Sequence, residues 1–163
     1  SMDLTALGEL TETAVRMLDN VIDISRFPID QQREEAVSKR RIGLGITGLA
    51  DALIMCGVRY GSEEAVNLTK NWLRVLRDSA YRCSIDLAKE KGSFPLFVKE
   101  KFIENHNVKK LPKDLRAGIN SYGIRNALLT SIAPTGTISL LANNVSSGLE
   151  PVFAFKYLSL IHI

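Results

Sequence analysis

Apolar residues recur at alternating spacings of three and four through the first half of the chain, and this period constrains the fold more than any other feature. The clearest example lies between Ser62 and Gly92 and opens with two glutamates. Its stripe of apolar and small residues is Ala65, Leu68, Trp72, Leu76, Ser79, Cys83 and Leu87. Serine is a favourable N-cap and glycine is favourable just after a helix C-terminus. The sequence therefore predicts one long helix between them.

Two further helices are predicted upstream. The first carries an apolar stripe and ends before Phe27-Pro28. That stripe is Leu7, Leu10, Ala14, Met17, Val21 and Ile24. The second begins at Asp30 as N-cap and is expected to run to about Gly57. Its apolar stripe (Ile42, Ile46, Leu49, Leu53) lies beside the small residues Gly45, Gly48 and Ala52. Such a face lets another element approach closely.

The second half of the chain reads differently. Residues 93–122 are expected to form short helical pieces between turns at Pro95, Pro112 and Gly118. Ala127–Ala133 is an apolar run with β-branched members and is short enough for a buried strand. Pro134–Thr137 breaks that run, and Ile138–Ala142 is compatible with a helix. The expected fold class is mainly α with a short β component near the C-terminus.

Composition excludes several classes of protein. The chain is 45% hydrophobic and 24% charged, which is an ordinary globular balance, and it has no apolar run of membrane-spanning length and no signal peptide. We therefore expect a cytoplasmic protein that does not contact a membrane. A net charge of +3 is too small to indicate nucleic-acid binding, and the lysines between Lys99 and Lys113 are expected on a solvated face. Cys56 and Cys83 lack the spacing of a disulfide or metal site and are expected to be small buried residues.

Two segments could bind phosphate. Gly43–Gly48 fits the pattern GxGxxG, but a dinucleotide fingerprint follows a strand, whereas this one is predicted within a helix, so close packing is the favoured interpretation. The second segment is Ala133–Ser139. Its backbone amides at a helix start, its hydroxyl groups and Gly136 could surround an anion, and no acidic residue lies between Asp114 and Glu150. An ordinary capped turn remains an equal alternative.

Three groups of residues resemble, in order and spacing, the C-terminal half of the catalytic barrel of ribonucleotide reductase large chains. They are Arg40–Ala52, Arg125-Asn126 with Ala133–Ser139, and Ser147–Phe153. The form PTGTIS is most similar to the adenosylcobalamin-dependent class. The resemblance covers residues 3–157; Ser1-Met2 is typical of a remnant of tag removal, and residues 158–163 depart from the family pattern.

The resemblance implies an incomplete piece of a ten-stranded α/β barrel. It implies an oxidoreductase that reduces ribonucleotides to deoxyribonucleotides by thiyl-radical chemistry, with adenosylcobalamin as cofactor. The implied phosphate ligands are Thr135, Gly136, Thr137, Ile138 and Ser139. The implied partners are a ribonucleoside di- or triphosphate and the remainder of the parent chain. Self-association is also expected, through the small-residue helix face or through Ala127–Ala133, because the missing half of the barrel would leave that strand with an open edge.

Catalytic residues are not expected in this segment. The radical cysteine of the family lies in an Asn-x-Cys-x-Glu motif that this sequence lacks, so the segment alone is expected to be inactive. A different class of function remains open. The chain could be a helical interaction domain that folds by itself and retains an anion site.

Overall fold

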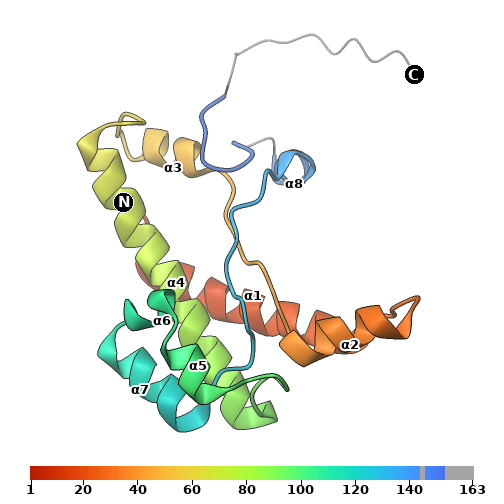
Figure 1. The fold of residues 1–163 in the computed structure, drawn as a ribbon. Helices are drawn as coiled ribbons and strands as arrows, with labels where there is room; N and C mark the ends of the chain where they lie inside the picture. Colours follow the sequence, from red (N-terminus) through yellow and green to blue (C-terminus); the bar gives the residue numbers. More distant parts are fainter. Residues whose placement is uncertain (144–145, 153–163) are drawn as a thin grey trace, which may run out of the picture. The chain divides into compact units, whose positions relative to one another are not determined.

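The structure is a computed structural model that describes residues 1–143 and 146–152. Within them the helices are α1 (Leu4–Ile24), α2 (Asp30–Lys39), α3 (Leu49–Met55), α4 (Glu63–Lys91), α5 (Lys99–Ile103), α6 (His106–Lys109), α7 (Lys113–Tyr122) and α8 (Gly136–Leu141) (Figure 1). The chain divides into two compact units. The larger unit contains residues 2–45 and 70–131, and the smaller unit contains residues 46–69 and the chain from Ile132.

The predicted long helix is confirmed as α4. The Ser62 hydroxyl accepts a hydrogen bond from the Ala65 amide at 3.1 Å, and Gly92 follows the last turn with a φ of +82°. The predicted first helix is also confirmed, since α1 ends at Ile24, before Phe27-Pro28. Its N-cap is Asp3, whose carboxylate accepts from the amides of Thr5 and Ala6. Local capping chemistry therefore positions both helices.

An aliphatic core fills the larger unit. The short helices α5, α6 and α7 gather beside the C-terminal half of α4 (Figure 1), where Leu115 and Ile119 pack with Ile85. Gly118 lies inside α7 and not at the predicted turn. A glycine suits this position because a β-carbon there would approach the Ile85 side chain to 3.2 Å. Phe94, Phe97 and Phe102 form an aromatic cluster at one end of this core.

The predicted helix from Asp30 to Gly57 is wrong in its middle. Helix α2 starts with Asp30 itself, has Ile29 as N-cap and ends at Lys39. Arg40 then adopts a left-handed conformation, with φ 46° and ψ 48°, and the next helix begins only at Leu49. Glycines at 43, 45 and 48 weaken a helix by about 1 kcal/mol each, so the apolar period alone could not sustain it.

The predicted short β component is also wrong. In residues 1–143 and 146–152 the structure has no β-strand, only an isolated parallel bridge between Leu44 and Thr130. The two segments do run side by side, since the Ile42 amide donates to Leu128 and the Leu44 amide donates to Leu129, at 3.0 and 2.8 Å. A parallel pair this short, with no third segment paired to it among the described residues, does not develop into a ladder. The part of the chain that the structure describes is therefore mainly helical and has no β-strand.

The smaller unit contains α3, the start of α4, and α8. Leu49, Ala50, Leu53, Val58 and Ala65 are its buried apolar residues. No helix within the two described ranges combines the length and the apolar character needed to cross a lipid bilayer.

Candidate functional site

The turn at residues 146–150 is fixed to the start of α3 by backbone hydrogen bonds. The Gly48 amide donates to the Ser146 carbonyl at 2.8 Å, and the Leu49 amide donates to the Gly148 carbonyl at 3.2 Å. In return, the Ser146 amide donates to a carboxylate oxygen of Asp51 at 2.6 Å. Both backbone polar groups of Ser146, which is 4% exposed, are therefore bound to one end of α3.

The second motif joins the same turn through Thr135. The Thr135 hydroxyl donates to the carbonyl of Ser147, the residue between the two that contact α3. Segments around residues 48, 135 and 147, far apart in sequence, thus meet within the smaller unit. We call these contacts the three-motif junction: Gly48, Leu49, Asp51, Thr135 and Ser146–Gly148.

The five predicted phosphate ligands fall into two groups: some of their polar groups already donate hydrogen bonds within the protein, and others do not. The hydroxyl groups of Thr135 and Ser139 already donate, to Ser147 and to the Gly136 carbonyl. The Gly136 amide donates to Pro134. Among the hydrogen bonds of the described residues, none is donated by the amides of Thr137 and Ile138 or by the Thr137 hydroxyl. These three donors, on exposed residues, are the ones available to an anion.

Gly136 leaves open space beside the turn. A β-carbon built on it would meet no atom within 4 Å, and its φ lies outside the left-handed region. The fold of this turn therefore does not require glycine at that position. A side chain there would fill the space next to the donors rather than disturb the chain.

A carboxylate does reach this region, contrary to what the acid-free stretch of sequence indicated. Glu150 folds back so that its carboxylate accepts from the Ser147 hydroxyl and from the Leu149 amide. The Ser147 hydroxyl, with the backbone amides, lowers the pKa of Glu150, so this side chain is ionised at neutral pH. Glu150 thus stabilises the turn by accepting hydrogen bonds and also places a negative charge on it.

The GxGxxG motif, Gly43–Gly48, lies between two helices and not inside one. The expected packing of a helix against this motif is wrong, but another segment does approach Gly43 closely: a β-carbon on Gly43 would meet the Ser131 β-carbon at 3.2 Å. Gly48, with a φ of 71°, is the N-cap of α3 and donates to Ser146.

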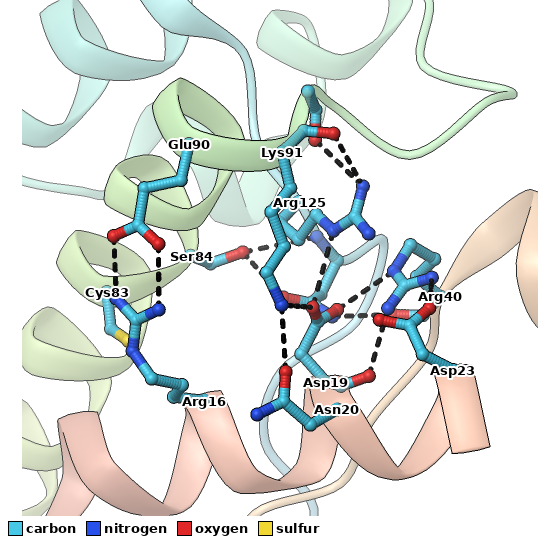
Figure 2. A network of polar contacts seen from close by, with 12 residues as sticks. Arg16, Asp19, Asn20, Asp23, Arg40, Cys83, Ser84, Glu90, Lys91 and Arg125 are labelled. Atoms are coloured by element: carbon cyan, nitrogen blue, oxygen red, sulfur yellow. Dashed lines mark hydrogen bonds and ion pairs between the residues drawn. The ribbon is translucent and has the colours of Figure 1, made fainter. Parts of the chain in front are cut away.

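A buried cluster of charges in the larger unit, centred on Asp19 of α1, went unnoticed in the sequence (Figure 2). Asp19 is fully buried and accepts from Arg40 at 2.9 Å, from the Asn126 amide group at 2.9 Å and from Arg125 at 3.3 Å. Burial would lower the pKa of Arg40, but its hydrogen bonds to Asp19 and Asp23 outweigh that effect and raise it. The same Arg40 contact lowers the pKa of Asp23.

This cluster explains two residues of the family-like motifs. Arg125, which lies in the stretch of sequence without acidic residues, contacts an internal anion, namely Asp19. Asn126 links the cluster to Ser84 of α4 and to the backbone of Arg40. The signal available in the sequence was the spacing of Thr11, Val15 and Asp19, which places a carboxylate on the buried row of α1.

The cysteines and lysines take the places expected of them, with one exception. Cys83 is buried, its thiol donates to the Glu12 carbonyl at 3.3 Å, and burial raises its pKa to about 11. Cys56 is only half-buried. The lysines between Lys99 and Lys113 are exposed. The residues that the structure describes include no group of His, Cys, Asp or Glu side chains able to hold a metal ion.

Comparison with known proteins places these motifs in a family. The family model described as "Ribonucleotide reductase, barrel domain" matches residues 1–159. The chain therefore belongs to the ribonucleotide reductase family.

Three relatives define the match more closely. The chain is 42% identical over 156 residues to a vitamin B12-dependent ribonucleoside-diphosphate reductase of Mycobacterium tuberculosis, which covers 96% of this chain and 20% of the relative. It is 36% identical to the protein of that name from Thermoplasma acidophilum, covering 96% of this chain and 18% of the relative. It is 33% identical to a ribonucleoside-diphosphate reductase subunit alpha of Chlamydia muridarum, covering 93% and 16%. The chain thus spans about a fifth, or less, of the length of these relatives.

Proposed function

We propose that this chain is the part of a ribonucleotide reductase that holds the phosphates of the substrate. In this proposal the parent enzyme reduces the 2′-hydroxyl of a ribonucleotide after a cysteine thiyl radical abstracts the 3′-hydrogen. The segment contributes positioning and electrostatic stabilisation, and none of the radical chemistry. The proposal rests on three donors, the amides of Thr137 and Ile138 and the Thr137 hydroxyl, which donate to no other described residue. They lie in the turn that resembles the phosphate-binding turn of the family.

The substrate is proposed to be a ribonucleoside diphosphate. The relatives are named as ribonucleoside-diphosphate reductases, and the vitamin B12-dependent names agree with the class indicated by Pro134–Ser139. Backbone amides are suited to phosphate because they supply partial positive charge without a counter-ion that must be displaced.

The radical cysteine is proposed to lie outside these 163 residues. A thiol that forms a radical must be reachable by the substrate, whereas Cys83 is buried and already donates to a carbonyl. Cys56 follows α3 and lies in no Asn-x-Cys-x-Glu motif.

Adenosylcobalamin is the proposed cofactor of the parent enzyme, where it would generate the radical. We assign no residue of this segment to the corrin. The proposed contribution of this segment ends at the substrate phosphates.

Titration of the ¹⁵N-labelled chain with inorganic phosphate tests the site. We expect amide shifts at Thr135–Ile138 with a dissociation constant on the order of millimolar, because sugar and base contacts are absent. Gly136→Val should abolish these shifts by filling the open space beside the donors. Thr137→Val should only weaken binding, because its amide remains.

Ala142→Val is the matched control, since it adds the same kind of bulk at the other end of α8. It should leave the titration unchanged. Shifts that map to other residues, or that survive Gly136→Val, would show that this turn is an ordinary capped helix start.

A further inference from the structure

We infer that Asp51 is a positioning residue for the phosphate turn, acting through the three-motif junction without touching the substrate. This inference rests on the proposed function. Asp51 lies in the first turn of α3, between the buried residues Ala50 and Leu53. Its carboxylate accepts from the Ser146 amide at 2.6 Å, a short distance for a bond from a neutral donor.

With the Asp51 contact, both backbone polar groups of Ser146 are hydrogen-bonded to the start of α3. The amide of Ser146 is held by the Asp51 side chain, and its carbonyl is held by the Gly48 amide at 2.8 Å. Two residues later, the Gly148 carbonyl is held by the Leu49 amide. Residues 146–148 are therefore fixed at both ends by the start of α3.

Ser147, between those two anchors, carries the constraint to the phosphate turn. Its carbonyl accepts from the Thr135 hydroxyl, and Thr135 is the N-cap of α8. The direction of the Thr137 and Ile138 amides follows from the conformation at Thr135. Asp51 thus controls, through two hydrogen bonds, the orientation of the donors that would bind phosphate.

Asp51 is suited to this role by its chemistry. Its negatively charged carboxylate accepts a hydrogen bond from the Ser146 amide. The carboxylate also lies in the first turn of α3, where the helix dipole stabilises acidic side chains. Asparagine can keep the contact, because its carbonyl oxygen also accepts an N–H, although without the charge. Alanine cannot.

The experiment uses the full-length reductase that contains this segment. Binding of cytidine 5′-diphosphate and of cytidine is measured by calorimetry for the wild type, Asp51→Ala and Asp51→Asn, together with kcat and KM. We expect Asp51→Ala to weaken diphosphate binding about tenfold and to raise KM similarly, as for loss of one charge-assisted hydrogen bond, while kcat and cytidine binding stay within about twofold. Asp51→Asn should fall between. Glu64→Ala, an exposed carboxylate in the first turn of α4, is the control and should match the wild type.

The outcomes separate this inference from the proposed function. A wild type that binds the diphosphate no better than cytidine contradicts the phosphate turn itself. A wild type that discriminates, with Asp51→Ala discriminating equally well, contradicts only the role of Asp51. Equal loss of both ligands in both variants, with a lowered melting temperature, would make Asp51 a residue of general stability and overturn the inference.

Discussion

At the scale of single residues, the buried carboxylate of Asp19 supports the most contacts. It neutralises Arg40, whose side chain is 3% exposed, and it contacts Arg125 and Asn126. A buried charge that loses its partner is not rehydrated, so the penalty falls on the residue that remains. The stability of the larger unit therefore depends on Asp19 and Arg40 being present together.

Replacing Asp19 by alanine tests this dependence. We expect the free energy of unfolding to fall by about 3–5 kcal/mol, because Arg40 is left buried without its principal anion. Urea denaturation measures the change. Asp86→Ala removes an ion pair with Lys89 in which both side chains are nearly half exposed, and it should cost less than about 1 kcal/mol. Similar losses in the two variants would contradict the special role of the buried pair.

Sequence reasoning found one side of the candidate site and missed the other. Thr135–Ser139 were selected because glycine, hydroxyls and a helix start occur together, and such local chemistry is visible in a sequence. Asp51 and Glu150 were missed as parts of the site because their partners lie on a distant segment or require a reversal of the chain. The Asp51 contact spans 95 residues. A single acidic residue in the apolar segment Leu49–Met55 was the only available signal.

At the scale of elements, the helices with strong caps were predicted well and the segments between them were not. Helix α4 has a serine cap, acidic residues at its start and a glycine after its end, all of which act within a few residues. The helix expected from Asp30 to Gly57 failed because the apolar period continued through residues whose conformation is set elsewhere. Arg40 leaves the helix to reach Asp19, and residues 42–44 pair with residues 128–131.

The close approach of residues 42–44 to residues 128–131 leads to a prediction about stability. Gly43→Val should destabilise the chain by about 1–3 kcal/mol, because its β-carbon would meet that of Ser131 at 3.2 Å and the added methyl groups would crowd the pair further. Chemical denaturation of the single variants and of the double variant Gly43→Val/Ser131→Gly provides the measurement. The double variant should recover part of the loss beyond the effect of Ser131→Gly alone, and strict additivity would show that the two residues do not compete for space.

At the scale of the whole molecule, helix α1 has more apolar surface than the rest of the larger unit buries. Val15 and Asp19 are buried, whereas Leu10, Met17 and Ile24 are 68%, 61% and 77% exposed. A helix with one buried stripe needs an apolar arc of only about 100°. Most of the predicted apolar stripe of this helix therefore faces solvent in this chain, and the buried row is formed by Thr11, Val15 and Asp19 instead.

Self-association of the isolated chain follows from that exposure, in place of the open strand edge that the sequence indicated. We expect a concentration-dependent increase in mass in the micromolar range, measured by analytical ultracentrifugation, because exposed apolar stripes of this kind favour contact with another surface. Met17→Lys should shift the equilibrium toward the monomer. Glu9→Lys, a change on the exposed polar side of the same helix, should not. A strictly monomeric wild type would contradict the prediction.

The three-motif junction also has a consequence for how the chain is made. Asp51 is synthesised long before Ser146, so α3 must wait for the translation of 95 further residues before its carboxylate finds that amide. Contacts of such long range form late, since the entropy of closing the intervening loop is lost before any contact repays it. During synthesis the larger unit can begin to assemble from α1, α2 and α4 while the start of α3 is still without its partner. A growing chain that has not yet released Ser146 from the ribosome therefore leaves the smaller unit without this contact and more open to proteases and chaperones.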